Sequence, residues 1–120
     1  LLVALPSKLK QGVEGAKETY VRLIDSQIGS GAAGYMAIKV LLDHGVLEER
    51  IIFICLLCSR IGGIQAISKA FPRIRIVSGA IDDELEERWS DGIGKQDAQK
   101  VFTILPGLGS FGDRYYSPIK

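Results

Sequence analysis

The longest uninterrupted apolar segment of this chain spans residues 51–58, and no other feature limits the possible folds as strongly. Its eight residues are far fewer than the roughly 20 that a membrane-spanning helix needs. Over residues 51–57 the apolar character is continuous and β-branched residues are frequent. This combination is typical of a central strand in a parallel sheet, covered on both faces by other elements.

Helices and strands are expected to alternate around this segment. Residues 20–25 predict a strand, and residues 32–44 carry apolar side chains at helical spacing. Gly45 follows that helix at the position where a left-handed C-cap is expected. A second helix is expected over residues 62–71, and Pro72 stops it.

Two further strands are expected, at residues 73–80 and 101–105. Between them, residues 82–91 hold six acidic residues and one arginine, which we interpret as a solvated helix or turn. Residues 88–100 show no clear apolar period and are expected to form a flexible loop or a short surface helix. The alternation of strands and helices predicts an α/β fold, with an open, mostly parallel sheet and flanking helices.

Ligands of such sheets bind beyond the carboxyl ends of the strands, so the loop at residues 25–33 is a candidate site. Its backbone N–H groups would converge on an anion with the positive end of the following helix. Gly29 and Gly31 allow a phosphate to approach closely, and Ser30 offers a hydroxyl. Asp25 could accept hydrogen bonds from sugar hydroxyls or hold a hydrated Mg²⁺. The alternative is the ordinary start of a helix, with Ser30 as N-cap.

The same loop carries the spelling GxGxxG, at Gly29, Gly31 and Gly34. In the dinucleotide-binding fingerprint the first glycine follows the strand closely, and an acidic residue ends the second strand. Here three residues separate Asp25 from Gly29, and Ser59 stands where the acidic residue is required. A dinucleotide-binding half-domain is therefore the least favoured of the functional hypotheses.

The charged residues, the cysteines and the histidine of the chain give no indication of a catalytic side chain. A formal net charge of +1 with dispersed bases suits a small anionic ligand such as a phosphate ester, and not nucleic acid. Cys55 and Cys58 are interpreted as core thiols of a reducing compartment, because residues three apart in a strand point to opposite faces. His44, the single histidine, is expected at the surface. The start of the chain lacks a basic-then-apolar leader, so a cytoplasmic protein is expected.

Residues 105–116 form a second candidate loop, whose first eight residues include three glycines and one proline. Its backbone could contact a flat heterocycle, or it could be an ordinary turn in which Asp113 pairs with Arg114. Together the two loops resemble the uracil phosphoribosyltransferase family: the first is similar to its phosphoribosyl-pyrophosphate (PRPP) loop, the second to its uracil loop. Residues 40–46 and 70–76 look most like the version fused behind a kinase in uridine–cytidine kinase-like proteins.

The resemblance spans about residues 20–116 and only the second half of the family's domain. It implies a partial phosphoribosyltransferase-like fold, with residues 1–19 as a lead-in cut from a longer domain and residues 88–100 as an inserted loop. It also implies pyrimidine salvage, in which PRPP and uracil give UMP and pyrophosphate with Mg²⁺, in a protein that is a homo-oligomer when full length. Neither a membrane nor a nucleic acid is an expected partner.

The resemblance also implies two sets of binding residues and no catalytic side chain. The PRPP-binding set is Asp25, Ser26, Gln27, Ile28, Gly29, Ser30, Gly31, Ala32, Ala33 and Ser110. The uracil-binding set is Ile104, Gly109, Ser110 and Phe111. A ribosyl transfer through a cationic sugar depends on positioning and charge stabilisation, so a nucleophilic side chain is not required.

Several positions depart from the family's pattern. Ser110 stands where most active members have an aspartate, and Ala32 and Ala33 replace the usual glycine and threonine. The arginines that would bind pyrophosphate belong to the upstream half of the family's domain. We therefore expect these 120 residues to be inactive alone. The alternative function is a non-catalytic nucleotide-binding or oligomerisation domain of the same fold.

Overall fold

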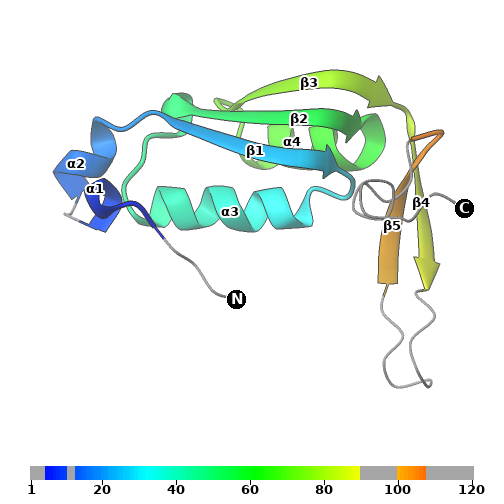
Figure 1. Ribbon diagram of the computed structural model, residues 1–120, viewed down its shortest axis with the longest axis horizontal. Coiled ribbons are helices and arrows are strands. Elements are labelled where there is room, and N and C mark those ends of the chain that lie inside the picture. The colour runs from blue at the N-terminus through cyan, green and yellow to red at the C-terminus, as the bar shows by residue number, and fades with distance from the viewer. Residues whose placement is uncertain (1–4, 11–12, 90–99, 108–120) are drawn as a thin grey trace, which may run out of the picture.

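The computed structural model describes residues 5–10, 13–89 and 100–107. Its main sheet contains three parallel strands, β1 (Val21–Ile28), β2 (Ile51–Ser59) and β3 (Arg75–Asp82), in the order β1-β2-β3 (Figure 1). The long apolar segment is therefore the central strand. The predicted α/β fold with a mostly parallel sheet is confirmed.

Short and long helices connect these strands. Two short helices, α1 (Ser7–Lys10) and α2 (Val13–Lys17), precede β1, and the long α3 (Ala32–Asp43) links β1 to β2 through the 3-10 turn η1 (Glu48–Arg50). Between β2 and β3, a π-helical turn η2 (Arg60–Ile64) leads into α4 (Gln65–Ala70). The second helical region thus begins two residues before the predicted start, and its first turn is wider than an α-helix. Within the described residues, no helix is both long and apolar enough to cross a membrane.

The end of α3 shows why the sequence predicts this helix well. Gly45 has a φ angle of 95°, the left-handed conformation that glycine adopts most readily. The Val46 N–H donates to the Leu41 carbonyl at 3.1 Å, and the Gly45 N–H donates to the Leu42 carbonyl at 2.9 Å. These two bonds form a Schellman motif, and its hydrophobic contact partners Leu41 and Val46 are both buried.

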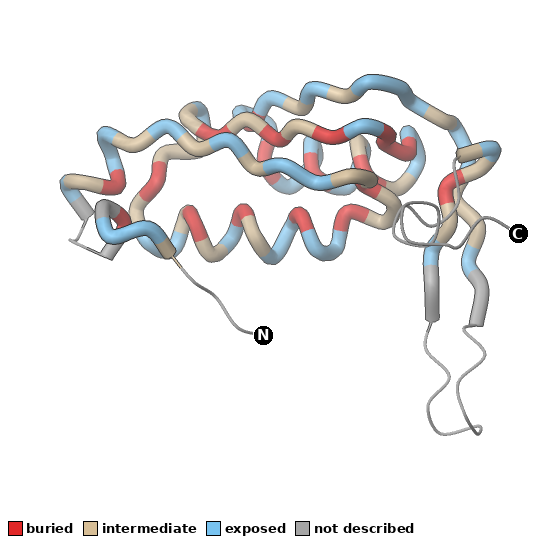
Figure 2. Tube along the Cα trace, viewed as in Figure 1, coloured by how far each residue is buried: buried red, intermediate tan, exposed pale blue. Residues whose placement is uncertain are grey.

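The core lies on one face of the sheet, against α3 and α4 (Figure 2). Gly34 of α3 faces both Phe53 of β2 and Ile67 of α4, so the two helices pack on the same side. The opposite face carries exposed apolar side chains, with Ile24 at 78%, Leu56 at 55% and Val77 at 53% exposure. The expectation that β2 is covered on both faces is therefore wrong in this structure. Successive right-handed crossovers in one direction place both helices on one side of the sheet.

The last two strands form a separate antiparallel ribbon. β4 (Glu84–Trp89) pairs with β5 (Lys100–Leu105), and Leu85 lies opposite Ile104. The prediction that residues 101–105 extend the parallel sheet is wrong, as is the helix or turn expected over residues 82–91. The expected loop at residues 88–100 is replaced at both ends by strand, and residues 90–99 lie outside the described part. The strand expected at residues 101–105 is therefore present as β5, but its antiparallel pairing with β4 depends on residues distant in the sequence.

Both cysteines are free and buried in the same core cluster. The expected core role is confirmed. The expected separation onto opposite faces is wrong, because both thiols belong to one core cluster and lie close enough for Cys55 to influence Cys58. The Cys55 thiol donates to the Ser78 hydroxyl at 3.3 Å. Burial, with a further contribution from neighbouring Cys55, raises the pKa of the Cys58 thiol to about 12.

This raised pKa predicts an alkaline loss of stability. The unfolded thiol ionises at its ordinary pKa of 9.0, whereas the folded thiol stays protonated until about 12, so the free energy of unfolding falls as pH rises between these values. One such group changes that free energy by at most about 1.4 kcal/mol per pH unit. In chemical denaturation across this range, Cys58→Ala is expected to show a shallower fall than the unaltered protein. Equal pH dependence in both proteins would contradict the assignment.

Candidate functional site

The candidate site begins at the loop of residues 29–31, which joins the carboxyl end of β1 to α3. Gly31 has a φ angle of 84° and occupies the N-cap position of α3. A side chain there would be strained, and its Cβ would lie 3.5 Å from both Ala66 and Gly63. The sequence requires glycine here for the turn itself. The N-cap is thus Gly31, and the alternative that Ser30 caps the helix is wrong.

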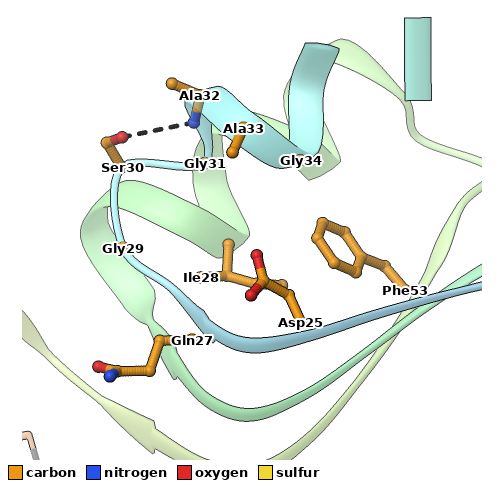
Figure 3. Close-up of a pocket in the computed structure, with 10 residues that line it drawn as sticks. All are labelled: Asp25, Gln27, Ile28, Gly29, Ser30, Gly31, Ala32, Ala33, Gly34 and Phe53. Carbon is orange, nitrogen blue, oxygen red and sulfur yellow. Dashed lines mark hydrogen bonds between the residues drawn. The ribbon is translucent and has the colours of Figure 1, made fainter. Parts of the chain in front are cut away.

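Around this loop lies a pocket open to solvent (Figure 3). Its lining residues are Asp25, Gln27, Ile28, Gly29, Ser30, Gly31, Ala32, Ala33, Gly34 and Phe53. Nine of these ten residues are consecutive or nearly so along β1, the loop and the first turn of α3. The structure therefore brings together all the predicted PRPP-binding residues except Ser26 and Ser110, of which Ser110 lies outside the described part.

The polar groups of this pocket are suited to an anion attached to a polyol. The first N–H groups of α3 have no partner within the helix, and they lie at its positive end. The Ser30 hydroxyl accepts a hydrogen bond of 3.4 Å from the Ala32 N–H. One oxygen of the exposed Asp25 carboxylate accepts from the Ser26 N–H at 2.7 Å. Figure 3 shows the Asp25 carboxylate above β1, while Gln27 extends away from it.

The β4–β5 ribbon lies against the same loop. A Cβ atom built on Gly29 would be 3.6 Å from the Leu85 side chain and 4.0 Å from the Ile104 side chain. Ile104, the first residue of the predicted uracil-binding set, is thus buried beside the loop after β1. Gly109, Ser110 and Phe111 lie outside the described residues. The loop after β1 and the described beginning of the second loop, up to Gly107, therefore lie at the same end of the sheet.

The tips of β2 and β3 carry polar residues that the sequence analysis did not assign to the site. Asp82 Oδ2 accepts a 2.9 Å hydrogen bond from the Gly107 N–H, which holds the beginning of the second loop. Arg60 forms a 2.5 Å ion pair with Asp83, so η2 is tied to the turn between β3 and β4. Ser59 is the register partner of Asp82 on the neighbouring strand. No local sequence pattern marks these residues, because they act through partners that are distant in the sequence.

Among the described residues, no group of three or more histidine, cysteine, aspartate or glutamate side chains could hold a metal ion. The dinucleotide hypothesis also loses support. β2 ends at Ser59, whose hydroxyl bonds to the Gly29 carbonyl, and not at a carboxylate that could hold a ribose.

The fold and the pocket define an α/β protein with a glycine-containing loop and an open pocket at the strand tips of a parallel sheet. A sequence model of the uracil phosphoribosyltransferase family matches residues 3–118. The chain therefore belongs to the uracil phosphoribosyltransferase family.

Individual relatives agree with this assignment. The chain is 42% identical over 103 residues to uracil phosphoribosyltransferase from Saccharomyces cerevisiae, covering 86% of this chain and 41% of the yeast protein. It is 37% identical over 99 residues to mouse uridine-cytidine kinase-like 1, covering 82% of this chain and 16% of the mouse protein. The solved structure of the AQ2163 protein from Aquifex aeolicus shares the fold, with a TM-score of 0.57, 23% identity, and coverage of 82% of this chain and 40% of that chain. The chain thus spans less than half of each of these three proteins.

Proposed function

We propose that this chain forms the PRPP- and uracil-binding part of a uracil phosphoribosyltransferase-like protein of pyrimidine salvage. The observation that carries the proposal is the position of Ile104 beside Gly29, at the loop where β1 enters α3. A sugar phosphate at the loop and a pyrimidine at the ribbon would then be neighbours. The reaction breaks the bond between ribose C1 and pyrophosphate and the N–H bond of a uracil nitrogen, and it forms a bond from C1 to that nitrogen, giving UMP, pyrophosphate and a released proton.

For PRPP, the backbone of residues 29–33 would bind the 5-phosphate. The left-handed Gly31 and the N-terminal turn of α3 support this assignment, because both line the pocket and the first N–H groups of a helix have no partner within it. Asp25 would accept hydrogen bonds from the ribose hydroxyls, with the carboxylate oxygen that does not bind Ser26 available for one of them. Ser26, Gln27 and Ile28 would support the loop through the backbone of β1.

For uracil, the main chain of Ile104 and of residues 109–111 would supply hydrogen bonds. The bond from Gly107 to Asp82 supports this assignment, because it fixes the chain three residues after Ile104. A reaction through a cationic sugar gains rate from the positions of the two substrates and from nearby negative charge. Exposed Asp25 supplies such a charge in the pocket.

The pocket residues fit a Mg²⁺ ion that binds together with PRPP. The ion commonly keeps several waters and binds through one or two carboxylates together with substrate phosphates. Asp25 is the carboxylate that lines the pocket, so the diphosphate of PRPP would provide the other charged ligands. The proposed setting is the cytoplasm, and the parent protein is proposed to be a homo-oligomer.

These 120 residues are expected to produce no UMP alone. Ser110 cannot supply the negative charge of the family's aspartate, and the chain spans only 41% of the yeast enzyme. The test incubates the purified chain with uracil, PRPP and Mg²⁺ and measures UMP by chromatography, with an active uracil phosphoribosyltransferase as positive control. Formation of UMP by the purified chain would contradict this prediction.

A second candidate is a non-catalytic relative that binds nucleotide or mediates oligomerisation. Ala32 and Ala33 favour it, because these residues give the pocket methyl groups in place of a hydroxyl donor. Calorimetric titration of the full-length parent with Mg·PRPP separates the two candidates. Binding supports the transferase, and its absence leaves the non-catalytic function.

A further inference from the structure

Ser59 is the last residue of β2 and lies beneath the loop that we assign to the phosphate. Its relative exposure is 0%, and among the described residues it is the one buried polar residue. A buried hydroxyl costs free energy unless its hydrogen-bonding capacity is used. Its partners therefore indicate why a polar residue occupies this position.

The Ser59 hydroxyl makes two hydrogen bonds that join two separate segments. It donates to the Gly29 carbonyl at 2.5 Å, and it accepts from the Gly63 N–H at 2.8 Å. The first partner belongs to the loop after β1, and the second belongs to η2. The bond to Gly63 is buried and is therefore stronger than it would be at the surface, and the bond to Gly29 is partly buried.

The bond to Gly29 sets the orientation of a peptide group in the loop. The carbonyl of Gly29 and the N–H of Ser30 belong to the same planar trans peptide, so they point in opposite directions. Since the carbonyl points inward to Ser59, the Ser30 N–H points outward from the protein interior. Ser59 thereby holds one of the loop's N–H groups in the direction from which an anion would approach.

We propose that Ser59 is a positioning residue for the phosphate loop, an inference that rests on the proposed function. It acts through the Gly29 peptide and does not itself contact the substrate. Ser59, which stands where the dinucleotide-binding fingerprint requires an acidic residue, thus has a proposed role in the phosphate loop. The accompanying bond to Gly63 extends this role, because it keeps η2 packed beneath the same loop.

The test compares Ser59→Ala with Ser78→Ala. Ser78 is a matched control, since its hydroxyl also donates to a carbonyl, that of Ala80 at 2.6 Å, and accepts from the Cys55 thiol at 3.3 Å. It lies within β3, away from the loop. Calorimetric titration with Mg·PRPP, at a temperature where each variant is folded, is expected to give an affinity on the order of tenfold weaker for Ser59→Ala and unchanged for Ser78→Ala. Ser59→Thr, which keeps the hydroxyl, is expected to restore most of the affinity.

Amide hydrogen exchange gives an independent measurement on the same proteins. Exchange at Gly63, whose N–H donates to the Ser59 hydroxyl, is expected to be faster in Ser59→Ala than in Ser78→Ala. Equal affinity losses in the two variants, or an unchanged affinity in Ser59→Ala, would overturn the positioning role. If the unaltered chain does not bind Mg·PRPP, the proposed function fails, and hydrogen exchange alone then tests the positioning role of Ser59. Faster exchange in Ser59→Ala would support that role, and unchanged exchange would overturn it.

Discussion

Asp25→Asn is expected to weaken Mg·PRPP binding by about tenfold to a hundredfold. Hydrogen bonds to a charged group contribute about 1.5–3 kcal/mol, and the substitution removes the charge while it keeps the size of the side chain. Asp25 is exposed at the pocket, and one of its two carboxylate oxygens accepts a hydrogen bond from the Ser26 N–H. The substitution should therefore affect the ligand more than the fold, with a change in the free energy of unfolding within about 0.5 kcal/mol.

Asp43→Asn is the matched control for this measurement. It removes the same charge at the opposite end of α3, where Asp43 forms an exposed ion pair of 3.8 Å with Lys39. Calorimetric titration should give the same Mg·PRPP affinity for this variant as for the unaltered protein. Equal affinities for Asp25→Asn and Asp43→Asn would contradict the assignment of Asp25 to the ribose.

Gly63→Ala is expected to lower the free energy of unfolding by about 1–3 kcal/mol, the usual range for overpacking. The new Cβ would lie 2.6 Å from Ile28 Cγ2 and 2.7 Å from the Ile28 carbonyl oxygen. A backbone atom at that distance cannot turn aside as a side chain can, so β1 or η2 must move. The same shift would disturb the hydrogen bond from the Gly63 N–H to Ser59.

Gly29→Ala is the control for this substitution, because it adds the same methyl group in the same region. Its Cβ would have 3.6 Å to the nearest atom, which is an ordinary contact. Urea denaturation should show a loss of stability for Gly63→Ala and little change for Gly29→Ala. Equal stabilities of the two variants would show that η2 is not packed against β1 as described.

The parallel sheet could be predicted because its signals are local. The apolar segment of β2, the helical spacing of α3 and the glycine at Gly45 each depend on residues close together in the sequence. The β4–β5 ribbon could not be predicted in this way, since Leu85 meets Ile104 across a long sequence separation. The uncovered face of the sheet also escaped prediction, because apolar composition does not reveal on which side the helices pack.

Part of the candidate site could also be predicted from the sequence, and part could not. The loop after β1 was identified because its glycines and its place between a strand and a helix have a direct physical meaning. Ser59 and Asp82 carry no such local signal, since their roles arise from partners 30 and 25 residues away. A single polar residue at the tip of a buried strand becomes informative only when the fold shows what it contacts.

The proposal depends on a shared pocket formed by the loop after β1 and the chain around Ile104. Amide NMR spectra of the isotopically labelled protein, recorded during titration with Mg·PRPP and then with uracil, locate both ligands at once. The expected result is that PRPP shifts the amide signals of residues 29–33, and that uracil then shifts those of residues 104–107. Signals that change only elsewhere, or that do not change with either ligand, would contradict the proposal.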